Sequence, residues 1–128
     1  MKKSYTILVA EDEEYNFTLV KYIFQKEGHK VLWAKNGIEA VNFIHDKNNA
    51  DIDLVIMDIK MPIMNGYEST RKIKEIRSDI PVLAVTAYAF AEDRKLSMDA
   101  GCDELITKPI NRENLLNTAY KLIEAHED

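Results

Sequence analysis

The fold of this chain is decided by residues 54–66, which read LVIMDIKMPIMNG. The first four of these residues are apolar and predict a short buried strand, which leads directly into Asp58. The proline and the Asn-Gly pair that follow indicate that the chain turns away from the strand at this point. In open α/β sheets, ligands bind just beyond the carboxyl ends of the strands, so Asp58 is a candidate functional residue.

Similar apolar runs recur along the chain, each about as long as one strand. The five strands that they predict lie at 7–10, 31–34, 54–57, 80–85 and 104–107. The segments between the strands carry apolar residues at helical spacing, among them Leu19, Ile38, Ile76 and Leu96. Strict alternation of strands and helices predicts an α/β fold in which helices cover both faces of a parallel sheet.

Size and composition indicate one ordinary globular domain. The chain has 128 residues, of which 46% are apolar and 30% are charged, and we expect a single domain over residues 1–128. Acidic residues outnumber basic ones by 22 to 17, which gives a net charge of -5. Such a surface repels a phosphate backbone, so we expect no direct binding of nucleic acid.

The single cysteine and the hydropathy pattern indicate the cellular compartment of the protein. Cys102 is the only cysteine, so it cannot form an internal disulfide, and the three histidines make no zinc motif with it. No apolar run approaches the roughly 20 residues that a membrane-spanning helix requires. We therefore expect a cytoplasmic domain without membrane insertion.

Polar residues stand at the ends of four of the predicted strands. Glu11 and Asp12 follow the first strand, Asp58 the third, Thr86 the fourth and Lys108 the fifth. If the strands pack in the order 2-1-3-4-5, these four strands are neighbours and their ends lie in one cleft. The second strand offers no comparable residue and lies at the edge. We therefore expect one site built from these five residues.

The charges in this cleft indicate a divalent cation. Three carboxylates contribute -3 and Lys108 contributes +1, which leaves about -2 when every group is ionised. An all-oxygen set of ligands with room for water suits Mg²⁺ better than zinc or calcium. Mg²⁺, Lys108 and Thr86 together would stabilise the oxygens of a phosphoryl group in transfer, and Asp58 would be the nucleophile.

Each residue also has a purely structural interpretation. Residues 11–14 suit the acidic first turn of a helix, and Asp58 and Thr86 suit turn or cap positions. Lys108 suits an exposed surface. The occurrence of all of them at the ends of four neighbouring strands favours a functional site over these separate interpretations.

The motifs at the strand ends resemble those of the receiver domains of two-component response regulators. The matching segments are 7–13 (ILVAEDE), 58–62 (DIKMP), 65–66 (NG), 86–87 (TA) and 108–109 (KP), which together span essentially the whole chain. The Glu-Asp pair and the stretch 86–109 are most similar to the receivers of hybrid sensor kinases. The resemblance implies a flavodoxin-like, doubly wound (βα)5 fold with a five-stranded parallel sheet of order 2-1-3-4-5.

By this resemblance, Asp58 would be the phosphoacceptor, which receives its phosphoryl group from a phosphohistidine. The partner would be a histidine kinase or a histidine phosphotransfer domain. Asp12 and Asp58 would bind Mg²⁺ directly together with the main-chain carbonyl of Lys60, and Glu11 would act mainly through a bound water. The domain would catalyse only its own phosphorylation and dephosphorylation, so we expect no enzyme activity on another substrate.

The resemblance also implies a switch. Thr86 and Lys108 would bind the phosphoryl oxygens, and the peptide bond from Lys108 to Pro109 would be cis. Movement of Thr86 towards Asp58 would change the face of the fourth helix, fifth strand and fifth helix, which is compatible with a phosphorylation-dependent dimer. Leu105 stands where the family usually has an aromatic residue, which predicts a weaker response or one carried by another side chain.

Two further positions bear on the lifetime of the phosphoryl group. By the resemblance, Lys60 and Tyr88 flank the path of the hydrolytic water. A long cation and a bulky ring at these positions predict slow self-dephosphorylation.

Other conspicuous residues are not assigned to the site. Trp33 lies on the second predicted strand, where packing is the expected role of a large aromatic residue. His29, His45 and His126 fall in different segments and predict no shared site.

Three alternatives fit parts of the pattern. A receiver-like docking module would keep the fold and signal without phosphorylation, although this chain has a residue at every chemical position. A phosphatase of the haloacid dehalogenase family would take its nucleophile from the first strand, and a flavodoxin would not place an acidic loop against the flavin phosphate. Both a stand-alone regulator and a domain of a hybrid kinase fit the sequence, since no output domain follows the fifth predicted helix.

Overall fold

The five apolar runs form one parallel sheet in the computed structural model, which describes residues 4–87 and 90–127. The strands are β1 (Thr6–Ala10), β2 (Lys30–Ala34), β3 (Leu54–Asp58), β4 (Val82–Thr86) and β5 (Glu104–Thr107). They pair in the order β2-β1-β3-β4-β5, which confirms the predicted topology. Because all strands run in the same direction, the carboxyl ends of β1, β3, β4 and β5 lie side by side at one edge of the sheet.

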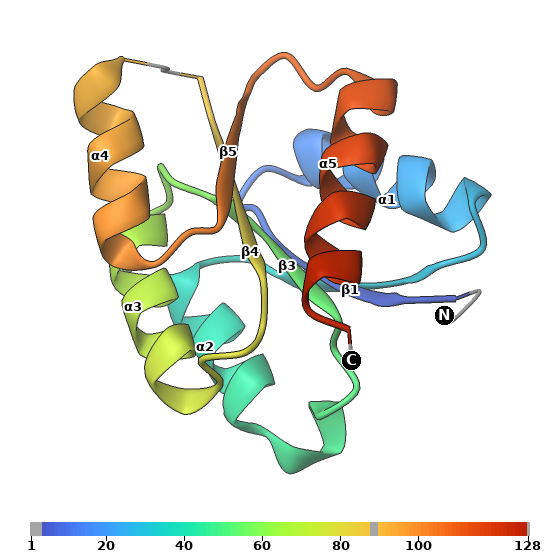
Figure 1. Cartoon of the computed structure of the whole chain (residues 1–128), viewed down its shortest axis with the longest axis horizontal. Helices are drawn as coiled ribbons and strands as arrows, with labels where there is room; N and C mark the ends of the chain where they lie inside the picture. The colour runs from blue at the N-terminus through green and yellow to red at the C-terminus, as the bar shows by residue number, and fades with distance from the viewer. Residues whose placement is uncertain (1–3, 88–89, 128) are drawn as a thin grey trace.

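In the described part of the chain, four α-helices connect successive strands, a fifth follows the last strand, and together they cover the sheet. They are α1 (Glu14–Lys26), α2 (Gly37–His45), α3 (Gly66–Ile76), α4 (Ala91–Ala100) and α5 (Arg112–Ala125), and a short 3-10 helix, η1 (Lys47–Asn49), follows α2. Figure 1 shows α1 and α5 on one face of the sheet and α2, α3 and α4 on the other. Within the described ranges, none of these helices is both long enough and apolar enough to cross a membrane. The two helical layers give the predicted doubly wound α/β fold.

Apolar side chains fill the space on both faces of the sheet. Along β1, Ile7 and Val9 pack with residues of α1 and α5, whereas Leu8 and Ala10 pack with residues of α2 and α3. This alternation follows from the two-residue repeat of a strand. The central strands are buried on both sides, which explains why their sequences read as continuous apolar runs.

The fourth strand is shorter than its apolar run. β4 begins at Val82 rather than at Ile80, because the intervening Pro81 has no N–H group to donate to a neighbouring strand. At the other end, Asp58 and Thr86 are the last residues of β3 and β4 rather than the first residues after them. The two polar side chains are therefore positioned by the sheet itself.

Four apolar residues of the helical pattern lie outside the core. Their side chains are between 38% and 40% exposed, namely those of Leu19, Ile38, Ile76 and Leu96. A helix at the surface buries only one stripe of its circumference, so residues at the margin of the stripe stay accessible. The helical spacing predicted the helices correctly but did not show which of these residues reach the core.

A glycine holds α3 against the end of β3. A Cβ atom on Gly66 would lie 2.5 Å from the carbonyl oxygen of Asp58 and 2.7 Å from the Cα atom of Ile59, so a larger residue does not fit without movement. The Gly66 N–H donates to the carbonyl oxygen of Ile59 at 2.9 Å. Asn65 caps the helix by accepting from the amide of Glu68 at 3.0 Å. The Asn-Gly pair therefore fixes the chain that follows Asp58.

Candidate functional site

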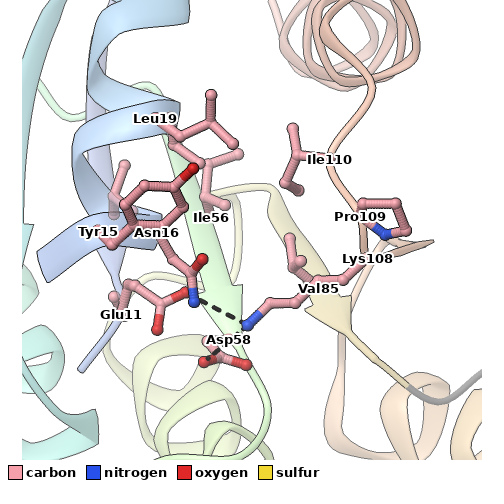
Figure 2. A pocket seen from close by; sticks show the side chains of 13 residues that line it. Glu11, Tyr15, Asn16, Leu19, Ile56, Asp58, Val85, Lys108, Pro109 and Ile110 are labelled. Atoms are coloured by element: carbon pink, nitrogen blue, oxygen red, sulfur yellow. Dashed lines mark hydrogen bonds and ion pairs between the residues drawn. The ribbon is translucent and has the colours of Figure 1, made fainter. Parts of the chain in front are cut away.

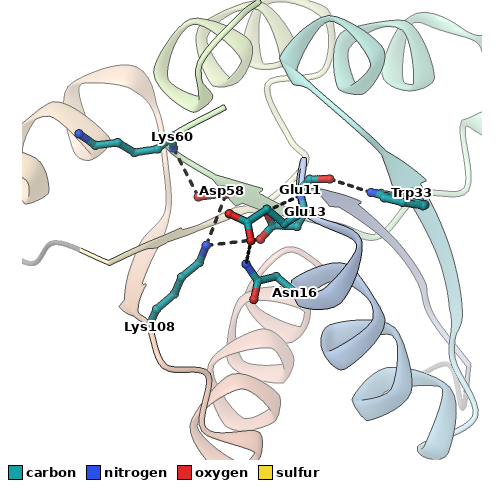
Figure 3. A network of polar contacts seen from close by, with 7 residues as sticks. All are labelled: Glu11, Glu13, Asn16, Trp33, Asp58, Lys60 and Lys108. Carbon is teal, nitrogen blue, oxygen red and sulfur yellow. Dashed lines mark hydrogen bonds and ion pairs between the residues drawn. The ribbon is translucent and has the colours of Figure 1, made fainter. Parts of the chain in front are cut away.

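Three charged side chains meet at the carboxyl ends of the strands. Glu11 directly follows β1, Asp58 ends β3 and Lys108 directly follows β5. The Nζ atom of Lys108 lies 3.4 Å from Glu11 Oε1 and 3.5 Å from Asp58 Oδ2. Dashed lines mark both contacts in Figure 3. Both carboxyl-bearing residues are only 5% exposed. The structure thus brings together three residues that the sequence placed at the ends of neighbouring strands.

Asp12 completes an acidic cluster. Carboxylate oxygens of Glu11, Asp12 and Asp58 all lie within 4.8 Å of one another. Glu11 and Asp58 are buried and Asp12 is exposed, so one side of the cluster opens to solvent. These oxygen donors, with room for water on the open side, fit a hard divalent cation such as Mg²⁺.

The cluster carries more negative charge than its lysine offsets. Burial, together with the negative charge of Asp58, raises the pKa of Glu11 to about 8, against opposing effects of the Glu13 amide and of Lys108. Burial also works against the charge of Lys108, but attraction to Asp58 and Glu11 outweighs it and raises the pKa of this lysine. The raised pKa of Glu11 shows that negative charge is crowded in this cluster, so an added positive charge would be stabilised there.

Thr86 lies next to this cluster at the end of β4. It is buried, and the residue before it, Val85, pairs with Asp58 in the ladder between β3 and β4. The N–H group of Lys108 donates to the carbonyl oxygen of Thr86 at 2.8 Å. A main-chain hydrogen bond therefore connects Thr86, which is expected to supply a hydroxyl, with Lys108, which supplies the amine.

Lys60 approaches Asp58 with its main chain rather than with its side chain. The N–H group of Lys60 lies 3.4 Å from Asp58 Oδ1. Its side chain is exposed and extends away from the carboxylates (Figure 3). Tyr88, the other position expected to affect the lifetime of the phosphoryl group, lies outside the described residues.

The segment around β5 carries two features of the expected switch. The peptide bond between Lys108 and Pro109 is cis, as the resemblance implies. Leu105 is buried in the core layer that faces α2 and α3. The position at which the family usually has an aromatic residue is therefore part of the packed core in this structure.

A cavity of about 230 Å³ opens beside the acidic cluster. It lies between α1 and the segment after β5, with Glu11, Asp58 and Lys108 at one end (Figure 2). Mainly apolar side chains line the remainder, including those of Tyr15, Leu19, Val20, Ile56, Val85 and Ile110. Sequence reasoning missed this cavity, because helical spacing does not show that Tyr15 and Leu19 border the site.

Trp33 packs as predicted and also contacts the site. Its ring stacks on that of Phe17, with the ring centres 4.4 Å apart and the planes at 5°. Its indole N–H donates to the carbonyl oxygen of Glu11 at 2.7 Å. No sequence signal indicates this hydrogen bond, because residue spacing does not show where an indole nitrogen points.

His29 and Cys102 lie away from the acidic cluster. At the opposite edge of the sheet, His29 Nδ1 accepts from the Tyr5 N–H at 3.0 Å, and His29 Nε2 lies 2.7 Å from the Tyr120 hydroxyl. Burial raises the pKa of the Cys102 thiol to about 11. This thiol therefore stays protonated at neutral pH and is a poor nucleophile.

Sequence comparison relates most of the chain to known signalling proteins. Residues 7–120 match the sequence model of the response regulator receiver domain. Hybrid signal transduction histidine kinase I of Dictyostelium discoideum is 41% identical over 111 residues, which are 82% of this chain and 6% of the kinase. Sensor histidine kinase GacS of Pseudomonas protegens is 33% identical over 120 residues, which are 90% of this chain and 13% of GacS. The chain therefore spans only a small part of these two relatives.

A third relative is similar in length to this chain. The polar-differentiation response regulator DivK of Brucella anthropi is 33% identical over 116 residues, which are 88% of this chain and 91% of DivK. Similarity thus extends both to a short response regulator and to segments of much longer kinases.

Solved structures share the fold over nearly the whole chain. A CheY-like response regulator receiver domain protein from Methanospirillum hungatei has a TM-score of 0.88 and 30% identity, and covers 95% of both chains. The receiver domain of sensor histidine kinase PA1611 from Pseudomonas aeruginosa has a TM-score of 0.86 and 28% identity, and covers 94% of this chain and 98% of its own. The PA1611 structure has a magnesium ion coordinated in its active-site cleft.

Proposed function

Because this chain belongs to the response regulator receiver domain family, we propose that Asp58 is the phosphoacceptor of a two-component signalling module. The observation that carries this proposal is the buried Asp58 carboxylate, which lies near both the Lys108 amine and the two other acids. Residues 1–128 would act as one receiver domain. Its partner would be a histidine kinase or a histidine phosphotransfer domain, since two of its relatives are histidine kinases.

In the transfer step, a carboxylate oxygen of Asp58 attacks the phosphorus of a phosphohistidine. An oxygen–phosphorus bond forms as the phosphorus–nitrogen bond breaks, and the leaving imidazole keeps the electron pair and takes up a proton. Lys108 would bind one oxygen of the phosphoryl group, and the Thr86 hydroxyl would bind another. The resulting acyl phosphate on Asp58 would carry the signal until it is hydrolysed.

We assign the metal ligands to the acidic cluster. The carboxylates of Asp12 and Asp58 and the main-chain carbonyl of Lys60 would hold Mg²⁺, and Glu11 would act mainly through a bound water. When bound, Mg²⁺ supplies positive charge for the phosphoryl oxygens. The exposure of Asp12 supports this assignment, because it leaves the cluster open to water and substrate. The magnesium ion in the cleft of PA1611 supports it as well.

The same atoms would operate a switch. Phosphorylation would draw Thr86 towards Asp58 and change the face formed by α4, β5 and α5. The hydrogen bond from the Lys108 N–H to the Thr86 carbonyl supports this coupling, since it ties β4 to the residue that binds the phosphoryl group. With Leu105 in the core, the response would be weaker or pass through another side chain. Such a switch is compatible with a phosphorylation-dependent dimer.

We also expect slow self-dephosphorylation of Asp58. This expectation rests on the resemblance at Lys60 and Tyr88 rather than on a contact between these side chains and Asp58. Loss of the phosphoryl group can be followed by mass after the phosphodonor is removed. A half-life of only seconds in the presence of Mg²⁺ would contradict the expectation.

Incubation with acetyl phosphate and Mg²⁺, followed by intact-mass measurement, tests the phosphoacceptor role. We expect wild type to gain one phosphoryl group and Asp58→Asn to gain none. Asp79→Asn is a matched control, because it makes the same chemical change at a residue whose side chain is 81% exposed and leaves the cluster intact. Absence of phosphorylation in wild type would overturn the proposal and favour a docking module that signals without phosphorylation.

A further inference from the structure

Trp33 connects the edge strand β2 to the acidic cluster. Its indole N–H donates to the carbonyl oxygen of Glu11 at 2.7 Å (Figure 3). The N–H group of Glu11 donates in turn to the carbonyl oxygen of Ala34 at 2.9 Å. Both main-chain polar groups of Glu11 are therefore held by residues of β2, the strand that supplies no charged group to the cluster.

The indole ring itself is held in place. One contact is the parallel stack on Phe17, which is a buried residue of α1. Another is the ammonium group of Lys35, which lies over the ring at 5.0 Å from its centre. Because these contacts restrict rotation of the ring, the N–H of Trp33 keeps a defined direction towards Glu11.

The position of the Glu11 carbonyl affects two of the three acids in the cluster. Asp12 is the next residue, and the amide of Glu13 donates back to Glu11 Oε2 at 3.2 Å, so residues 11–13 form a short linked segment. A shift of the Glu11 main chain would move the carboxylates of both Glu11 and Asp12 relative to Asp58. The spacing within the cluster, now within 4.8 Å, would change accordingly.

We propose that Trp33 is a positioning residue for divalent-cation binding, whose indole N–H fixes the Glu11 main chain and so sets the spacing of the three carboxylates. The proposal rests on the Mg²⁺ site proposed above. It differs from a packing role in what it predicts. Loss of packing lowers the stability of the fold, whereas loss of positioning lowers the affinity of the folded, metal-free protein for the cation.

The experiment separates the ring of Trp33 from its N–H group. Trp33 is the only tryptophan, so biosynthetic replacement by benzothienylalanine puts sulfur in place of the N–H at this position alone and keeps the stacking ring. Trp33→Phe removes the donor by ordinary mutagenesis. Lys30→Ala is the matched control, because it removes an exposed lysine at the other end of the same strand and keeps the indole N–H and the contacts of its ring. Mg²⁺ is titrated into each protein and the dissociation constant is measured by calorimetry, with urea denaturation in EDTA as the measure of stability.

We expect both proteins without the indole N–H to bind Mg²⁺ about fivefold more weakly than wild type. Lys30→Ala should stay within about twofold of wild type, since it leaves that hydrogen bond and the contacts of the ring in place. Unchanged Mg²⁺ affinity in the benzothienylalanine protein would overturn the positioning role alone. Absence of Mg²⁺ binding by wild type would overturn the proposed metal site and the positioning role together.

Discussion

At the carboxyl ends of the strands, Lys108 lies 3.4 and 3.5 Å from two buried carboxylates, whereas at the amino ends Lys74 lies 2.8 Å from Asp103. The second pair has further partners, since Lys74 donates to the carbonyl oxygen of Ile80 at 2.7 Å and Asp103 accepts from the amide of Val82 at 2.8 Å. The first site instead sets three acids against one lysine. The charged pair at the amino ends thus has partners for both of its members. Negative charge is in excess at the carboxyl ends, where a ligand is expected.

Asp53 and His29, which also lie at the amino ends, have partners as well. Asp53 accepts from the amide of Thr6 at 2.9 Å. His29 has a partner at each ring nitrogen, the Tyr5 amide at 3.0 Å and the Tyr120 hydroxyl at 2.7 Å. These bonds connect the beginnings of the strands to one another and to α5. The polar groups at the amino ends therefore stabilise the fold.

Asp103→Asn should have the largest effect on stability. The substitution removes the charge that pairs with Lys74, whose side chain is only 17% exposed, and weakens the bond to Val82. We expect the free energy of unfolding to fall by about 2 kcal/mol, measured by urea denaturation. Asp79→Asn is the control, because Asp79 is 81% exposed and lies 3.9 Å from Arg77. A loss of the same size in the control would show that the pair of Lys74 and Asp103 contributes no more to stability than an exposed pair does.

Asp58→Asn should have a smaller effect of opposite sign in the metal-free protein. The substitution removes a buried negative charge that lies within 4.8 Å of two other carboxylates. We expect the free energy of unfolding in EDTA to rise by about 1 kcal/mol, because relief of repulsion outweighs the lost attraction to Lys108. If the free energy of unfolding instead fell as it does for Asp103→Asn, the charge of Asp58 would stabilise the fold, and the contrast between the two ends of the strands would be wrong.

The smallest predicted effect is a pH dependence that comes from His29. Burial lowers the pKa of His29, although the negative charges of Glu27 and Asp53 partly oppose the shift. The folded state therefore favours the neutral ring, and the unfolded chain binds more protons once the pH falls below the ordinary histidine pKa of about 6.5. The contribution of His29 to stability is fully present above that pH and is lost as the pH falls towards the lower pKa of the folded state.

Urea denaturation at a series of pH values checks this prediction. His29→Gln should flatten the decline in stability below about pH 6.5. His45→Gln is the control, because His45 is exposed on α2 and its loss should leave the decline in place. The same decline in His29→Gln as in wild type would contradict a role for this buried ring.

Sequence reasoning reached the sheet and the strand-end residues because both depend on local patterns. Asp58 and Lys108 each follow an apolar run, and parallel topology carries such positions to one edge. The pair of Lys74 and Asp103 could not be predicted in this way, because its members are 29 residues apart and meet only through tertiary packing. The bond from Trp33 to Glu11 likewise depends on the direction of a side chain, which no periodicity encodes.

Locating the phosphoryl group within the chain decides whether Asp58 is its acceptor. Wild type would be incubated with acetyl phosphate and Mg²⁺, digested at low temperature and analysed by fragment-ion mass spectrometry. We expect a single phosphoryl group on Asp58, and none when EDTA removes the cation. A phosphoryl group on any other residue, or equal modification of Asp58 in EDTA, would contradict a Mg²⁺-dependent phosphoacceptor at the acidic edge of this sheet.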